Sequence, residues 1–183
     1  LEDWIDRNPY EEGVNWVHAQ EVALRAISWT WAWHLFHDAE CFSKDIRIKF
    51  LKVLNWHLRY LERHVCAYGK WTHNHLISEL AGLYIVSRVF PFFNRSQRLE
   101  QWSRKLLERE SVKQILPEGI AAELSTNYML FIMDSLLGVV CCDTNYWSRS
   151  RTQKLLIEMS KASAHLIRPD KTLPFLGDND SGR

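Results

Sequence analysis

Charged residues alternate along this chain between dense and nearly absent stretches, and this alternation constrains the fold more than any other feature. A hydrophobic period near 3.6 predicts helices throughout, and no credible alternating strand pattern is found. The six expected helices span residues 14–38, 44–66, 74–90, 95–116, 127–142 and 146–167. The first, third and fifth contain three, two and one charged residues, whereas each of the others contains between five and nine.

A helix that is apolar around most of its circumference is buried, whereas a helix with one charged face covers a surface. The sequence therefore predicts inner and outer helices in alternation, as antiparallel hairpins joined by short loops. This is an all-α fold of the (α/α) toroid type. Because three hairpins do not close a ring, we expect an arc of an incomplete barrel over residues 1–172 and a linker at 173–183. The N-termini of the three inner helices would then share one rim.

Composition excludes several classes of function. The chain has 183 residues, 46% of them apolar, and a net charge of +1, which describes one sizeable core without the basic excess typical of nucleic-acid or membrane-surface binding. The longest apolar run, residues 129–142, is too short to span a bilayer, and the first residues do not resemble a signal peptide. The four cysteines form no C-x-x-C pair, so we expect them to be buried apolar side chains.

Two polar clusters lie directly before inner helices, at residues 72–75 (THNH) and 123–128 (ELSTNY). Helix capping explains one polar residue in each cluster but not a run of them. Helix N-termini present free N–H groups and a partial positive charge, so we expect the rim to accept anions such as carboxylates. The rim residues expected from this arrangement are Asn15, Trp16, Asn74, His75 and Tyr128.

Each of these residues also has a plain structural interpretation. His73 and His75, even with Glu79, lack the further ligands that a metal site requires at helical spacing, so no metal site is predicted. Tyr128 is either a core tyrosine with its hydroxyl at the rim or a general acid–base group.

One face of the first helix is polar. His18, Glu21 and Arg25 share it, which indicates either a buried ion pair with a hydrogen-bonded histidine or a stripe that faces a substrate. Arg25 is the stronger candidate for the second arrangement.

Four segments match one family together, in order and spacing. They are residues 8–9 (NP), 13–16 (GVNW) and 21–26 (EVALRA); 74–76 (NHL), 79 (E) and 81–82 (AG); 114–119 (QILPEG), 123 (E), 125 (S) and 128 (Y); and 176–183 (LGDNDSGR). Together they resemble the heparinase II/III-like polysaccharide lyases, relatives of the alginate and oligo-alginate lyases. Two positions depart from the family pattern: Met129 stands where histidine often follows the tyrosine, and Glu118 where aspartate is usual.

The resemblance implies an α/α toroid followed by an antiparallel β-sandwich domain, and cleavage of uronic-acid polysaccharides by β-elimination. By resemblance, Asn74, helped by His75, neutralises the uronate carboxylate, which makes the C5 proton acidic enough to leave. Tyr128, by resemblance, is the general base or acid. The residues expected to bind substrate are Asn15, Trp16, Arg25, Glu123 and Ser125.

The expected partners are an acidic polysaccharide and the β-sandwich domain, with no nucleic acid and no membrane. No cofactor is expected in this chain, although a structural metal in the β-domain fits the family, as does a periplasmic or secreted location.

Two other functions stay open. One is a non-catalytic glycan-binding or biosynthetic accessory protein with a lyase-like fold. The other is a glycoside hydrolase, which needs paired carboxylates, and Glu79, Glu118 and Glu123 have no evident partners.

Overall fold

The structure is a computed structural model that describes residues 1–67 and 73–178. Its six long helices are α2 (Ala19–Phe36), α3 (Lys44–His64), α4 (Asn74–Val89), α5 (Ser96–Gln114), α6 (Thr126–Cys142) and α8 (Arg151–Leu166). Three short elements complete it: α1 (Glu2–Arg7), the 3-10 helix η1 (Val14–Trp16) and α7 (Thr144–Trp147). Within the described residues the only strand-like pairing is an isolated bridge between Ile115 and Ala121. The predicted all-α class is confirmed.

All six predicted helices are present, and two of them begin five residues later than predicted. The first begins at Ala19 because His18 has extended backbone angles and separates α2 from η1. The last begins at Arg151, since the Ser150 hydroxyl accepts a hydrogen bond from the Gln153 amide at 3.0 Å and starts a new helix there. The sequence does not predict α1, because its six residues are too few to show a period.

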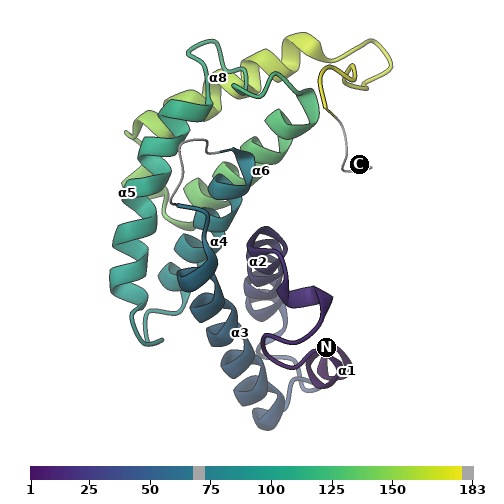
Figure 1. The fold of residues 1–183 in the computed structure, drawn as a ribbon, viewed down its shortest axis with the longest axis vertical. Helices are drawn as coiled ribbons and strands as arrows, with labels where there is room; N and C mark the ends of the chain where they lie inside the picture. Colours follow the sequence, from purple (N-terminus) through teal and green to yellow (C-terminus); the bar gives the residue numbers. More distant parts are fainter. Residues whose placement is uncertain (68–72, 179–183) are drawn as a thin grey trace.

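Inner and outer helices alternate as predicted. Helix α4 packs against α2 and α6 on its two sides and against α3 and α5. Its residues 76–87 are all buried. Figure 1 shows the resulting arc, with α2 and α3 toward one end, α8 toward the other, and α4 between them. This arrangement is an arc of an α/α toroid.

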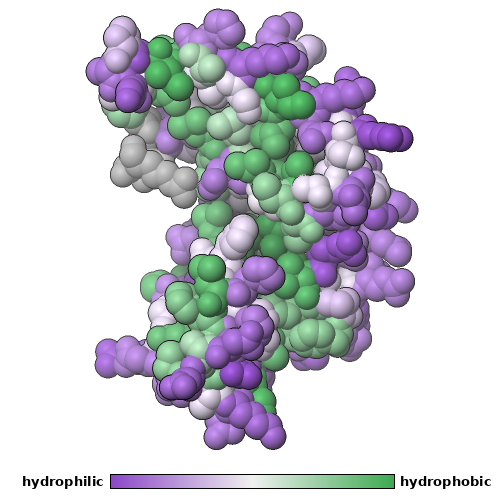
Figure 2. Space-filling model, turned by 180° about the vertical axis from the view of Figure 1, so that it is seen from behind, coloured by the Kyte–Doolittle hydropathy of each residue, from purple (hydrophilic) through white to green (hydrophobic). Residues whose placement is uncertain are grey.

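The two flanking inner helices are less buried than predicted. Trp31 and Leu35 on α2, and Leu137 on α6, are about half exposed or more. A groove between α2 and α6 is lined by Trp31, Leu137 and, from α4, Ile85. Figure 2 shows apolar residues gathered along the middle of one face of the molecule. Only α4, which has helices on both sides, is buried around its whole circumference.

The prediction of buried cysteines is wrong. Cys41, Cys66 and Cys141 are exposed, Cys142 is half-buried, and all four are free. Cys41 and Cys66 lie in the segments that follow α2 and α3, where the chain leaves the helical core. Cys141 lines the groove between α2 and α6. None of the helices in the described segments has both the length and the apolar content needed to cross a membrane.

The contact between α2 and α4 depends on two small residues. A Cβ atom placed on Gly82 of α4 would lie 2.8 Å from the Cβ and 2.9 Å from the Cα of Ala23 on α2. The two helix backbones therefore approach each other more closely than any larger side chain permits. This close approach brings the starts of α2 and α4 together.

We expect Gly82→Ala to destabilise the protein by about 1–3 kcal/mol, because the added methyl group overpacks the contact between helices. Gly138→Ala on α6 is the matched control, since its Cβ would meet only the tip of the Ile85 side chain, at 3.4 Å. The control should be neutral or stabilising by up to about 1 kcal/mol, through the higher helix propensity of alanine. Urea unfolding of both variants measures the difference, and equal effects would contradict the close-contact interpretation.

Candidate functional site at the rim of the inner helices

The N-termini of the inner helices meet at one rim, as the sequence predicted. Gln20, in the first turn of α2, donates a hydrogen bond from Nε2 to Oδ1 of Asn74 at 3.2 Å. Asn74 is the first residue of α4, and its backbone N–H donates to Oε1 of Glu123, just before α6, at 2.7 Å. These two bonds connect all three helix starts through Asn74.

Asn74 is the centre of this site and is only 4% exposed. Its Nδ2 donates to Oε1 and Oε2 of Glu123, at 3.1 and 2.9 Å. His73 occupies the N-cap position of α4 but makes no side-chain capping bond. The Glu123 carboxylate therefore takes the place of a cap, and the anion expected at this helix start is a side chain of the protein itself.

A group of histidines lies beside Asn74. The exposed rings of His73 and His75 are in edge-to-face contact with centroids 4.5 Å apart. Partial burial lowers the pKa of His75 below its usual range, nearby His73 and His18 lower it further, and the Glu123 carboxylate opposes them. The His75 imidazole is therefore neutral at neutral pH. Within residues 1–67 and 73–178, no group of three or more His, Cys, Asp or Glu is placed to hold a metal ion. Thr72 of the predicted polar cluster lies outside the described residues.

Tyr128 lies in the first turn of α6 and is half-buried. The Ser125 hydroxyl caps this helix by accepting a hydrogen bond from the Tyr128 amide at 3.2 Å. The same hydroxyl donates to the carbonyl oxygen of Asp178 at 2.6 Å. The Ser125 side chain is thus bonded to the backbone on both sides, and its predicted contact with substrate stays a prediction.

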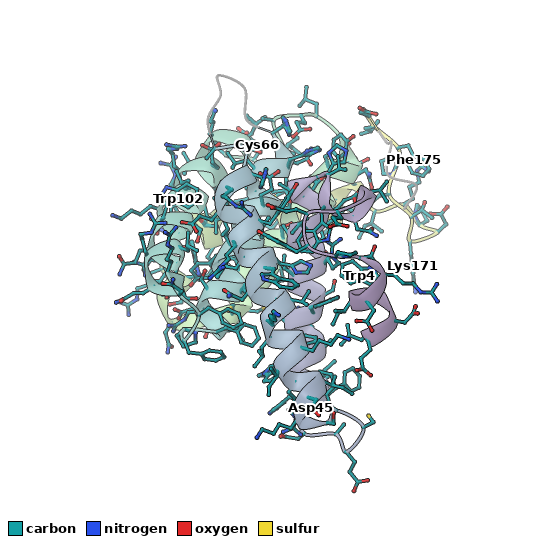
Figure 3. All side chains as sticks on the ribbon, turned by 60° about the horizontal axis from the view of Figure 1, so that its bottom comes forward. Trp4, Asp45, Cys66, Trp102, Lys171 and Phe175 are labelled. Atoms are coloured by element: carbon teal, nitrogen blue, oxygen red, sulfur yellow. The ribbon has the colours of Figure 1, made fainter. Side chains whose placement is uncertain are left out.

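The segment after α8 returns to the rim and lies along the start of α6. The Thr126 amide donates to the carbonyl of Leu176 at 3.0 Å, and the Thr126 hydroxyl donates to the carbonyl of Pro174 at 2.7 Å. Phe175 is 72% exposed, and Figure 3 shows it on this segment, away from the helices. The segment predicted as a linker therefore forms one wall of the rim near Tyr128, up to residue 178.

Three predicted substrate-binding residues lie in a second cluster, around Arg25. Its Nη2 donates to the carbonyl of Asn15 at 2.7 Å, and its Nε donates to Nε2 of His57 at 2.8 Å. The guanidinium lies 4.7 Å from the ring centre of Trp4 and 5.3 Å from that of Trp16. Burial lowers the pKa of Arg25 to about 10, so it keeps its charge at neutral pH.

This cluster is an aromatic box that joins α1 to the α2–α3 hairpin. Figure 3 shows Trp4 at the junction, and its ring contacts Trp29 on α2 edge-on at 5.2 Å. Glu21 is exposed and forms no salt bridge with Arg25 among those described. The structure therefore brings Asn15, Trp16 and Arg25 together. No hydrogen bond of the described residues joins them to Asn74, and their substrate contact stays a prediction.

Gln20 is a rim residue that the sequence did not predict. It lies directly before residues 21–26, which belong to one of the matching segments, but a glutamine in the first turn of an apolar helix carries no distinctive pattern. Only the close packing of α2 on α4 brings it to Asn74.

Comparison with known proteins identifies the family of the chain. The family model described as "Heparinase II/III N-terminus" matches residues 1–183, and the chain belongs to this family. A heparin-sulfate lyase of Pedobacter heparinus is 25% identical over 191 residues, which is 97% of this chain and 28% of that protein. The chain thus spans little more than a quarter of the length of this relative.

Solved structures share the fold. The heparan sulfate lyase HepC from Pedobacter heparinus superposes with a TM-score of 0.67 at 24% identity, over 94% of this chain and 28% of that one. A structure of heparinase III superposes with a TM-score of 0.75 at 18% identity, over 92% of this chain and 26% of that one. The arc of helices is therefore the toroid arrangement of the heparinases.

We expect His57 to make stability depend on pH. Its ring is fully buried, and burial lowers its pKa to about 3. The unfolded chain therefore takes up a proton below about pH 6.5 that the folded chain does not, and stability falls by up to about 1.4 kcal/mol per pH unit between 6.5 and 3. The contribution of the neutral, buried His57 to the free energy of unfolding is fully present above pH 6.5.

The check is urea unfolding at several pH values in that window for wild type and His57→Gln. The variant should be less stable at pH 7 but should lose less stability on acidification. His165→Gln, which replaces an exposed histidine, should keep the wild-type pH dependence. Parallel curves for wild type and His57→Gln would contradict the assignment.

Proposed function

We propose that this chain is the helical part of a polysaccharide lyase that cleaves uronic-acid-containing glycans by β-elimination. The observation that carries the proposal is the Asn74 amide at the start of α4, fixed between Gln20 and Glu123 on the rim that also holds His75 and Tyr128. Membership in the heparinase II/III N-terminus family supports it.

The chemistry explains why such a site needs an amide and a phenol. The C5 proton of a uronate leaves only when the charge of the neighbouring carboxylate is neutralised, so that the carbanion becomes an enolate-like species. Asn74 supplies an N–H donor at a helix start, where the partial positive charge favours an anion. The neutral His75 adds a hydrogen-bonding group beside it.

Tyr128 moves the proton. It removes the C5 proton or protonates the departing C4 oxygen, while the C5–H electron pair forms the C4–C5 double bond and the C4–O bond breaks. The second proton-transfer group belongs to a β-sandwich domain of the longer protein. The proposed substrates are heparin- or heparan-sulfate-like glycans first and alginate-like glycans second, met in the periplasm or outside the cell, with no cofactor bound by this chain.

One observation favours a second candidate, a glycan-binding or biosynthetic accessory protein without turnover. The Asn74 amide already donates to a carboxylate of the protein, so a uronate would meet a negative charge there. Such a protein binds the polysaccharide without releasing an unsaturated product. A glycoside hydrolase finds less support, because it needs a pair of carboxylates that reach the substrate. Glu79 is only 1% exposed, and it accepts a hydrogen bond from the Cys66 amide at 2.7 Å. Burial raises the pKa of Glu79.

The test uses the full-length protein that contains this chain, with heparan sulfate, heparin and alginate as substrates, and follows the ultraviolet absorbance of the unsaturated product. We expect turnover of at least one of them. Tyr128→Phe should lower kcat by about 100-fold or more, because the proton-transfer group is lost.

Tyr146→Phe is the matched control, since Tyr146 is exposed and its hydroxyl bonds to Glu108 on the outer helix α5. It should leave the rate unchanged. Full activity in Tyr128→Phe would overturn the mechanism. Glycan binding without any product would favour the accessory protein.

A further inference from the structure

Glu123 is exposed, yet both of its carboxylate oxygens bind Asn74. One carboxylate accepts from the backbone N–H and from the side-chain Nδ2 of the same residue. This double contact fixes the Asn74 side chain relative to the start of α4. Holding an exposed glutamate in one conformation costs side-chain entropy, and a single exposed contact offsets little of that cost.

The chemistry of the two neighbours decides which way the amide faces. A carboxylate only accepts hydrogen bonds, so Glu123 selects the NH2 group of Asn74. With the NH2 group held by Glu123, the oxygen of the same amide accepts a hydrogen bond from Nε2 of Gln20. A flipped amide would turn its oxygen toward Glu123, where two acceptors repel each other. Glu123 therefore holds one of the two amide orientations, and Gln20 satisfies the oxygen in that orientation.

The loop that carries Glu123 is held on its α5 side. The Ala122 amide donates to the carbonyl of Gln114 at 2.8 Å, and the Leu124 amide donates to that of Ala121 at 2.9 Å. Leu124 adopts a left-handed φ of 55°, which is uncommon for a residue with a branched side chain. This conformation turns the chain directly after Glu123.

The same loop is held on its other side by the segment after α8. Gly177 has a φ of 71°, and a Cβ atom there would lie 2.5 Å from the carbonyl oxygen of Leu124. The neighbouring Ser125 hydroxyl is bonded to the carbonyl of Asp178. Glu123 is thus presented by a braced turn and does not lie on a loose loop.

We propose that Glu123 is a positioning residue, which holds the Asn74 amide in the orientation that offers an N–H to the uronate carboxylate, and that it does not itself bind substrate. This inference rests on the proposed lyase function. Nδ2 carries two hydrogens, so one can remain directed between the two oxygens of Glu123 while the other serves the substrate. The helix start offsets part of the repulsion between the two carboxylates.

The test is a double-mutant cycle in the full-length protein, with Asn74→Ala, Glu123→Ala and the double variant. Each single variant should lower kcat by about 100-fold with a small change in KM, since misplacement of the neutralising group acts on the transition state. The double variant should be no slower than Asn74→Ala, because Glu123 acts only through Asn74. Glu123→Gln keeps one acceptor oxygen and should recover part of the rate. Glu40→Ala removes an exposed carboxylate beyond α2 and should change nothing.

A second readout does not depend on activity. The first N–H groups of a helix have no acceptor within it, so protection of the Asn74 amide from hydrogen exchange depends on Glu123. This protection should fall by about 10-fold or more in Glu123→Ala and stay unchanged in Glu40→Ala.

The outcomes separate this inference from the proposed function. An active wild type with additive losses in the double variant would overturn the positioning role, and so would unchanged exchange at Asn74 in Glu123→Ala. A wild type that cleaves no uronate glycan would overturn the proposed function. A loss of protection at Asn74 would then still support the contact itself.

Discussion

The burial of α4 on all sides is the constraint on which the rest of the structure depends. A helix with so few charges must be covered, and α2 and α6 cover its two sides while α3 and α5 pack behind it. The small residues Ala23 and Gly82 let α2 and α4 approach closely. Because the inner helices run in the same direction, covering α4 also gathers three helix starts at one rim. The candidate site is thus a consequence of how the core is packed.

At that rim, the polar groups of the helix starts are hydrogen-bonded to one another. Asn74 accepts a hydrogen bond from Gln20 and donates from its backbone N–H and its Nδ2 to Glu123. The Ser125 hydroxyl, at the start of α6, donates to the backbone of the segment after α8. Buried polar groups need partners, and these contacts supply them. They also leave one edge of the Asn74 amide at a rim that holds the neutral His75 and, in the first turn of α6, Tyr128. This set of groups suits the neutralisation of a carboxylate followed by proton transfer.

The order of inner and outer helices and the position of the rim were predictable from the sequence. The charge alternation gave the inner and outer helices, and the polar runs before residues 76 and 129 located the rim, because both signals are local and periodic. The contact of Gln20 with Asn74 and the capping of α4 by Glu123 were not predictable, since each joins residues about 50 positions apart through close helix packing. Arg25 was expected near substrate, but the missed helix α1 supplies Trp4 to the aromatic box that holds it.

The central claim is that Asn74 meets the uronate carboxylate at this rim. The most direct measurement is a crystal structure of the full-length Tyr128→Phe variant with a uronate-containing oligosaccharide bound. We expect the carboxylate within hydrogen-bonding distance of Nδ2 of Asn74, while Glu123 still accepts a hydrogen bond from the backbone N–H of Asn74. The ring of residue 128 should face C5 or the C4 oxygen. A saccharide bound away from the rim, or a carboxylate that contacts neither Asn74 nor His75, would contradict it.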